Sequence, residues 1–180
     1  ALAKAKPDTI TYGSAGNGSV NHLVGEMFNS AAGVKLMHVP YRGAAPAMQD
    51  LMGGRINLVF SSLPSVSGAI KNGTLHPIAV TSSKRAASFS NIPTIAEAGY
   101  KDFDINPWFG LFAPAKVPAN IIKRINADVN DVVKLKDVTD KFAAQGAEPY
   151  LTTPQEFAAV LKADIAKWSL VVKSSGASVD

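Results

Sequence analysis

The chain carries, at residues 9–19, the stretch Thr-Ile-Thr-Tyr-Gly-Ser-Ala-Gly-Asn-Gly-Ser. Residues 9–12 predict a β-strand, because β-branched and aromatic side chains favour extended backbone. A loop of glycine and serine follows, and apolar side chains then recur at helical spacing from Val20 to Ala31, with Gly33 in place to end the helix. A strand, a glycine-rich loop and a helix in this order are typical of a βαβ unit on a parallel sheet.

The same alternation continues through the first hundred residues. Further strands are predicted at 35–39, 56–60 and 75–81, where short apolar runs lie between turn signals. The helices predicted among them are one with Pro46 in its first turn and Gly53-Gly54 at its end, one at 64–72, and a brief one from a Thr94/Glu97 capping box to Gly99. The prediction is therefore an α/β fold with a mainly parallel sheet flanked by helices.

The remainder of the chain has a different character. Residues 104–112 predict a strand interrupted by a proline and a glycine, which suits a crossover between two lobes. Two apolar stripes follow on charge-balanced helices, at 121–133 and 157–172, and both are interpreted as structural. The last helix is predicted to begin at Thr153, because Pro154 suits the first helical position and Glu156 completes a capping box.

Composition and charge exclude several classes of protein. The 180 residues include no cysteine, and 47% of them are hydrophobic, which indicates a globular chain without disulfides, thiol catalysis or cysteine-based metal sites. No apolar run approaches the ~20 residues of a membrane-spanning helix, and residues 1–7 lack the pattern of a signal peptide. The net charge of +4 arises within residues 1–100, where the basic residues are scattered singly. This distribution favours a small anionic ligand over nucleic acid.

The loop at 13–19 is the first candidate site. Backbone amides and the positive end of a helix dipole favour an anion there, and the hydroxyls of Ser14 and Ser19 are further donors. The loop lacks the Lys-Ser/Thr of an NTPase phosphate loop, the glycine spacing of a dinucleotide site and the Gly-x-Ser-x-Gly of a nucleophile elbow. An ordinary tight turn with Ser19 as the helix N-cap explains the pattern equally well, and both interpretations stay open here.

Two further loops follow predicted strands. Tyr41-Arg42-Gly43 leads into a helix, and ligands of open α/β sheets bind outside such strand ends, so this loop is expected to converge with the first. Arg42 suits a bidentate carboxylate contact, although a solvated or structural ion pair is the commoner role of a single arginine. Ser61 lies in a third loop, where polar turn residues explain the sequence nearly as well.

Catalysis has little support in the sequence. His22, His38 and His76 have no metal-ligand spacing and are interpreted as structural. A hydrolase triad built on Ser14 or Ser19 requires a histidine and a carboxylate nearby, and His22 is the histidine that the sequence does not exclude. No convincing acid–base pair is present, so the prediction is a protein that is not an enzyme and holds no cofactor and no metal.

Several motifs in order resemble one known family. They are Tyr12-Gly13-Ser14-Ala15-Gly16-Asn17-Gly18-Ser19, His38-Val39-Pro40-Tyr41-Arg42-Gly43, Pro46-Ala47-Met48-Gln49-Asp50-Leu51, Ile92-Pro93-Thr94 and Trp108-Phe109-Gly110-Leu111-Phe112-Ala113-Pro114. Together they resemble the substrate-binding proteins of tripartite tricarboxylate transporters, the Bug-type family, over the whole chain.

The resemblance implies a fold and a function. It implies a periplasmic binding protein of the type II, two-lobed kind, which captures a small carboxylate (a dicarboxylate, tricarboxylate, amino acid or aromatic acid) and delivers it to transporter membrane subunits. The ligand-binding residues that it implies are Ser14, Ala15, Gly16, Gly18, Ser19, Asn21 at the adjoining helix, Tyr41, Arg42, Gly43 and Ser61.

One departure from the family concerns length, because its members are longer at the N-terminus. Residues 1–105 are therefore expected to form a nearly complete second lobe, and 106–180 the crossover strand and C-terminal part of an incomplete first lobe. Weak ligand affinity and self-association through the incomplete lobe follow as expectations. A lobe used for sensing through a protein partner is the alternative function, and an esterase based on Ser14 or Ser19 is a more distant one.

Overall fold

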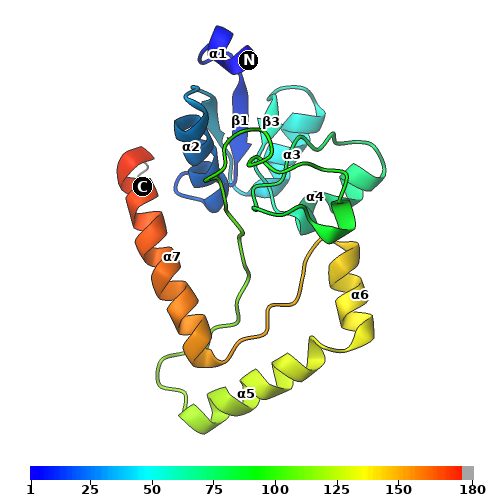
Figure 1. The fold of residues 1–180 in the computed structure, drawn as a ribbon, viewed down its shortest axis with the longest axis vertical. Coiled ribbons are helices and arrows are strands. Elements are labelled where there is room, and N and C mark those ends of the chain that lie inside the picture. The colour runs from blue at the N-terminus through cyan, green and yellow to red at the C-terminus, as the bar shows by residue number, and fades with distance from the viewer. Residues whose placement is uncertain (176–180) are drawn as a thin grey trace.

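The computed structural model describes residues 1–175 and has a parallel β-sheet in the part of the molecule that is uppermost in Figure 1. Its strands are β1 (Thr11–Ser14), β2 (Met37–Pro40) and β3 (Leu58–Val59), in the spatial order β2-β1-β3. The helices are α1 (Leu2–Ala5), α2 (Val20–Ala32), α3 (Ala44–Met52), α4 (Leu63–Lys71), the 3-10 turn η1 (Ala87–Phe89), α5 (Ala119–Val132), α6 (Lys136–Ala144) and α7 (Pro154–Ser175). The chain is thus α/β with a parallel sheet flanked by helices, as predicted.

The order of the strands determines where a ligand site can form. The chain passes from the central strand β1 to β2 on one side and then crosses to β3 on the other. One connection therefore leaves β1 toward β2, and the next returns across β1 to β3. Helix α2 forms the first connection and α3 the second, and the two helices diverge at the carboxyl end of β1. In open α/β sheets this point of reversal is where ligands bind, which directs attention to the carboxyl ends of β1 and β3.

Local chemistry explains why α2 begins and ends where it does. The hydroxyl of Ser19 accepts a hydrogen bond from the His22 N–H, and so caps the first turn. Gly33 ends the helix with φ 58°, in the left-handed region that glycine adopts without strain. Leu23 and Val24 point into the core, where Val24 packs with Phe103 and other apolar residues. The predicted helix and its end are confirmed.

The first strand is longer at its carboxyl end than predicted. β1 includes Gly13 and Ser14, which the sequence had placed in the loop, because both pair in parallel with β2. A Cβ at Gly13 would lie 2.6 Å from Ile56 Cδ1, so the strand approaches its neighbours closely at a residue without a side chain. The other two strands, by contrast, are shorter than predicted. The helix predicted at 64–72 is α4, displaced by one residue.

Two elements predicted in residues 75–99 are absent. The run 75–81 forms only an isolated bridge between Val80 and Thr94, because no further strand lies beside it within the described residues. The Thr94/Glu97 capping box is half formed: Thr94 Oγ1 accepts the Glu97 N–H, but the Glu97 carboxylate pairs with Arg85. A series of turns replaces the predicted helix.

The predicted crossover strand at 104–112 is extended chain that pairs with no other strand in the described part of the protein. Pro107 has no N–H to donate to a ladder, and Phe109 is 85% exposed. Trp108, unlike Phe109, packs against the rest of the protein: its Nε1 donates to Asp164 Oδ2 at 2.5 Å, and its ring contacts Phe157 edge to face. The segment therefore packs on α7 through single side chains rather than through a sheet.

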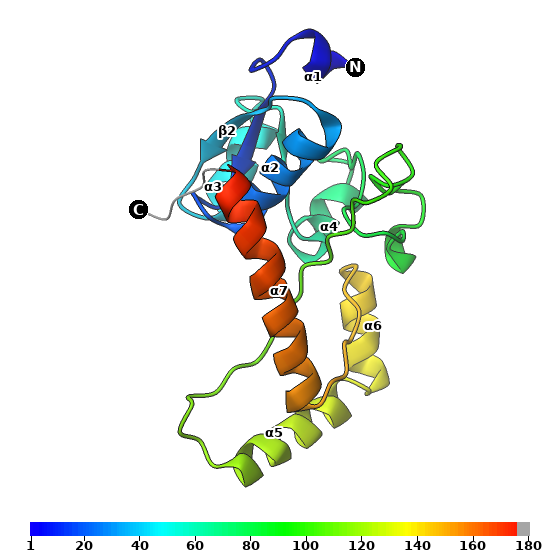
Figure 2. The ribbon, with the colours of Figure 1, turned by 60° about the vertical axis from the view of Figure 1, so that its left-hand side comes forward.

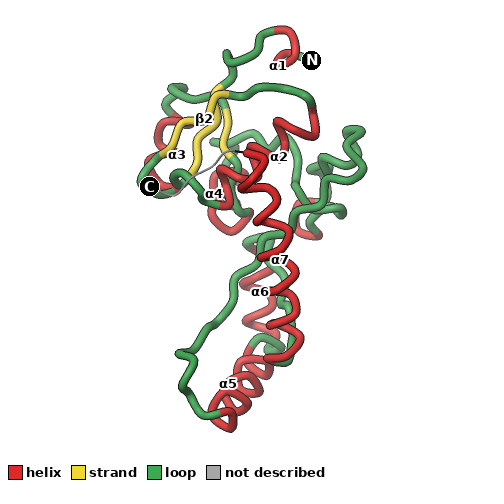
Figure 3. Tube along the Cα trace, turned by 90° about the vertical axis from the view of Figure 1, so that its left-hand side faces the viewer, coloured by secondary structure: helices red, strands yellow, loops and turns green. Residues whose placement is uncertain are grey.

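Helices α5, α6 and α7 form an arm that extends away from the sheet (Figures 2 and 3). The upper part of α7 packs on α2, and Trp168 contacts the core cluster that contains Val24. The start of α7 is as predicted, because Thr153 and Glu156 form a complete capping box. The apolar stripe on α5 is more exposed than a structural role predicts, with Val132 51% exposed. Among the described residues, no helix has both the length and the apolar character needed to cross a membrane.

Candidate functional site

The three strands end at one edge of the sheet, and each is followed by a helix. The N-termini of α2, α3 and α4 come directly after β1, β2 and β3. A small hollow lies among these elements at the carboxyl ends of β1 and β3, and its lining includes Ser14, Ala15, Asn21, Ala44 and Ser61. Helix N-termini present free N–H groups and a partial positive charge, so the hollow has the character of an anion site.

The two loops that were expected to converge lie side by side. The Tyr41 N–H donates to the Ser14 carbonyl and the Gly43 N–H to the Ala15 carbonyl, each at 3.2 Å. Gly16 has φ 129°, and a Cβ there would lie 3.3 Å from the Tyr41 carbonyl oxygen, so this close approach of the two loops requires a glycine. The predicted convergence of the loops is present.

The serine hydroxyls serve the loop itself. Ser14 Oγ lies 3.1 Å from the Gly16 carbonyl and Ser19 Oγ donates to that carbonyl at 2.6 Å. Ser14 is only 2% exposed, and Ser19 also caps α2. Within residues 1–175, by contrast, the backbone N–H groups of Ala15, Val20 and Asn21 have no acceptor. The donors of the 14–19 loop that remain for a ligand therefore include these main-chain amides.

The other predicted residues differ in how they face the hollow. Asn21 Nδ2 donates to the Phe60 carbonyl, which ties the start of α2 to the end of β3, next to Ser61. Tyr41 turns away, since its hydroxyl donates to Asp50 at 2.8 Å, and burial together with this bond raises the pKa of Tyr41. Arg42 is exposed and has no ion-pair partner among the described residues.

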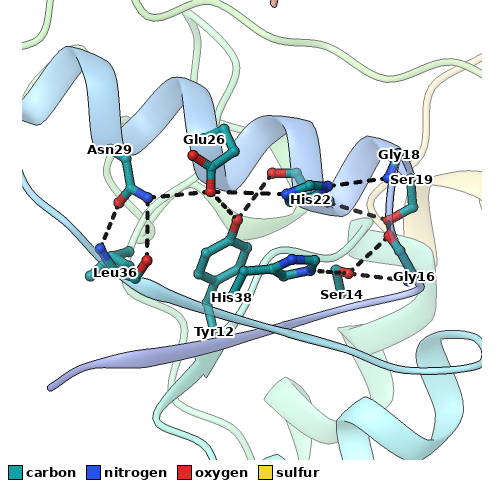
Figure 4. A network of polar contacts seen from close by, with 10 residues as sticks. All are labelled: Tyr12, Ser14, Gly16, Gly18, Ser19, His22, Glu26, Asn29, Leu36 and His38. Carbon is teal, nitrogen blue, oxygen red and sulfur yellow. Dashed lines mark hydrogen bonds and ion pairs between the residues drawn. The ribbon is translucent and has the colours of Figure 1, made fainter. Parts of the chain in front are cut away.

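A polar network beneath the loop was missed by the sequence analysis (Figure 4). His38 Nε2 lies 2.6 Å from Ser14 Oγ, and His22 Nδ1 accepts the Gly18 N–H at 3.1 Å. The two imidazole rings stack with their centroids 3.9 Å apart. The spacing of His22 and Glu26, four residues apart on one helix, was the available signal, but their partners depend on how β1 and β2 align.

Burial determines the charge of this network. The pKa of His38 is lowered to about 4, first by burial and then by the neighbouring His22. The pKa of His22 is also lowered by burial, against the opposing effect of Glu26. Tyr12, which donates to Glu26 at 2.6 Å, has its pKa raised by burial. Both histidines are therefore neutral at pH 7.

The Ser14–His38 contact differs from a catalytic pair. A serine nucleophile must reach its substrate, and a carboxylate must orient the second nitrogen of the histidine. Ser14 is buried, and no carboxylate bonds the His38 ring in the part of the chain that the structure describes. The same residues contain no group of three or more side chains placed to hold a metal ion. The contact instead stabilises the loop.

Comparison with known proteins supports a receptor. The model of the tripartite tricarboxylate transporter family receptor (TctC) matches residues 1–177. Among solved structures, "R. palustris Rpa4515 with adipate" is 36% identical with a TM-score of 0.92, and the match covers 98% of this chain and 59% of that one. "Periplasmic binding protein BugD" is 30% identical with a TM-score of 0.87, over 97% and 59% of the two chains. MatC from Rhodopseudomonas palustris, with bound malate, is 27% identical with a TM-score of 0.83, over 95% and 59%.

These likenesses define a family and also a difference in length. The chain spans about half the length of most of the curated relatives that it matches, and 94% of one of them, the "UPF0065 protein in clcB-clcD intergenic region" of Pseudomonas knackmussii. Its similarity to solved binding proteins nevertheless extends over nearly all of its own residues. The chain belongs to the family of tripartite tricarboxylate transporter receptors, as the motifs in its sequence indicated.

Proposed function

We propose that this chain captures a small carboxylate as part of a solute receptor that serves a membrane transporter, and that it is not an enzyme. The observation that carries the proposal is a set of main-chain N–H groups, at Ala15, Val20 and Asn21, that have no acceptor among the described residues; Ala15 and Asn21 line the hollow. Carboxylates accept hydrogen bonds from such groups at helix N-termini. The similar proteins that contain adipate and malate support a dicarboxylate as the ligand.

The remaining site residues have different roles in this proposal. Gly16 and Gly18 allow the loop its conformation, and Ser14 and Ser19 hold it through the Gly16 carbonyl. Ala44, at the start of α3, and Ser61 complete the other side of the hollow. Gly43 joins the second loop to the first through its N–H, which donates to the Ala15 carbonyl. Arg42, whose guanidinium is exposed, supplies long-range attraction for an anion.

The lobes and the setting are also part of the proposal. Residues 1–105 form the second lobe of the receptor, and within 106–180 the described residues 106–175 contribute the crossover and part of the first lobe. The solved proteins of similar structure include periplasmic binding proteins, which supports a periplasmic location for this chain and delivery of its ligand to transporter membrane subunits. The exposed apolar side chains of the 104–112 segment and of the arm, including Phe109, Leu111 and Val132, are the surface through which two copies of the chain associate.

A thermal-shift screen followed by calorimetry tests the ligand proposal. Adipate and malate are expected to raise the melting temperature by mass action, while their uncharged diamides do not. Arg42→Gln should weaken binding by about threefold to tenfold at low ionic strength, and less at high salt. Lys84→Gln removes an equal charge from an exposed residue away from the hollow and should leave affinity unchanged. Equal shifts with the diamides, or no shift with either dicarboxylate at millimolar concentration, would contradict the proposal.

Sedimentation velocity tests the association proposal. The apparent mass should increase with protein concentration, and Phe109→Ser should reduce that increase because it removes an exposed aromatic ring. Ser90→Ala, on the exposed surface of the other part of the molecule, serves as the control. A monodisperse monomer at high concentration would show that the arm does not self-associate.

A further inference from the structure

We propose that His22 and His38 are positioning residues for the 14–19 loop, and that His22 holds the loop in its ligand-binding conformation only while its ring is neutral. The inference rests on the proposed carboxylate site, because it assigns a function to the network beneath that loop (Figure 4). It makes ligand binding weaker in acid, by a route that involves no contact between either histidine and the ligand.

The hydrogen bond from Gly18 to His22 determines the protonation state of the His22 ring. Because the Gly18 N–H donates to Nδ1 at 3.1 Å, that nitrogen must carry a lone pair. The proton of the neutral ring is then on Nε2, which faces Glu26 Oε1 at 4.0 Å. Protonation of Nδ1 would place two donors against each other, so the Gly18 N–H would lose its acceptor and the loop would move.

His38 acts on the same loop two residues earlier. Ser14 Oγ accepts the Gly16 N–H at 3.1 Å and lies 3.1 Å from the Gly16 carbonyl and 2.6 Å from His38 Nε2. All three contacts are satisfied when His38 Nε2–H donates to Ser14 and the Ser14 hydroxyl donates to Gly16. The imidazole thus orients the hydroxyl that holds both polar groups of Gly16.

The stacked rings connect these two supports. The ring centroids are 3.9 Å apart, so two positive charges would repel each other strongly, and protonation of one histidine opposes protonation of the other. The titratable groups that face the pair are Glu26 on α2 and Tyr12 on β1, which bond to each other at 2.6 Å. Burial lowers the pKa of both histidines, so the pair is neutral at pH 7 and titrates in acid.

The sign of the pH effect distinguishes positioning from simple electrostatics. A positive charge on His22 would attract a carboxylate in the neighbouring hollow and strengthen binding in acid. Loss of the Gly18 hydrogen bond would disorder the loop and weaken binding. The proposal therefore requires affinity to fall as the pH decreases below 7 and His22 becomes protonated.

Three variants separate the outcomes when affinity for adipate is measured by calorimetry between pH 5 and 7. Ratios to wild type at each pH cancel the titration of adipate itself. His22→Asn keeps an acceptor oxygen near the Nδ1 position and does not titrate. Its affinity should match that of wild type at pH 7 and exceed it at the acidic pH where His22 of the wild type is protonated. His22→Leu should bind about tenfold more weakly at pH 7, as expected for one lost hydrogen bond. His76→Asn alters an exposed histidine and should behave as wild type.

A second measurement does not depend on any ligand. The amide signal of Gly18 in a 1H–15N NMR spectrum should follow the titration of His22 in wild type and should be insensitive to pH in His22→Asn. Its hydrogen exchange should be faster in His22→Leu. If adipate and malate fail to bind but the Gly18 amide behaves in this way, the carboxylate proposal fails and the positioning role stands. A Gly18 amide that ignores the pH, or tighter adipate binding by wild type in acid, would overturn the inference.

Discussion

The lowered pKa of His38 predicts how much stability the folded protein loses in acid. The pKa of this histidine is about 4 in the folded protein, against an ordinary value of 6.5. The unfolded chain therefore binds a proton more readily than the folded chain between these two values, and the free energy of unfolding decreases as the pH falls below 6.5. One pKa unit corresponds to 1.36 kcal/mol, so His38 contributes a loss of about 2 kcal/mol by pH 5 and about 3 kcal/mol by pH 4.

Urea denaturation at pH 7 and pH 5 measures this loss. Other groups also titrate over the interval, so the comparison is between wild type and His38→Gln, whose amide nitrogen can take the place of Nε2 beside Ser14. The decrease in unfolding free energy should be about 2 kcal/mol smaller in the variant, or about 1 M of urea in the midpoint. His76→Gln, at an exposed histidine, should show the full wild-type decrease. Equal decreases in wild type and His38→Gln would refute the assignment of His38 as a neutral, partly buried group.

Two further variants test the packing and the helix ends. Gly25→Ala should destabilise the protein by about 1–3 kcal/mol, because its Cβ would lie 2.3 Å from the buried ring of Tyr12. Gly68→Ala, which has open space around it in α4, should be neutral or stabilising. Chemical denaturation compares the two variants, and equal effects on the free energy of unfolding would contradict the prediction. Thr153→Ala should remove the α7 capping box and lower the free energy of unfolding by about 1 kcal/mol, while Thr153→Ser should keep most of that stability. A Thr153→Ala variant as stable as wild type would show that the capping box does not stabilise the protein.

Features that depend on neighbouring residues were predictable from the sequence. The helix from Ser19 to Gly33 and the start of α7 at Thr153 were predicted, since a hydroxyl cap, a terminal glycine and a capping box act within a few residues. The convergence of the first two loops was also predictable, because parallel strands bring their carboxyl ends to one edge.

Features that depend on distant partners were not. The run 75–81 has the residues of a strand but lacks a neighbour to pair with, and Glu97 bonds to Arg85 instead of completing its capping box. The contact between Ser14 and His38 follows from the register of β1 and β2, in which Ser14 lies opposite Pro40. A shift of the register by one residue would turn His38 to the other face of the sheet. The sequence therefore identified the loop but not the side chains that support it.

The arrangement of the sheet also bears on how the protein folds. Each of its strands is joined to the next through one helix, so the segment from Thr11 to Lys71 contains the whole sheet and the helices that line the hollow. Its contacts close short loops, whereas the packing of α7 on α2 joins segments more than a hundred residues apart and closes a much longer one. The hollow should consequently assemble early as a cooperative unit, with α7 docking afterwards and detaching first when the native protein opens locally.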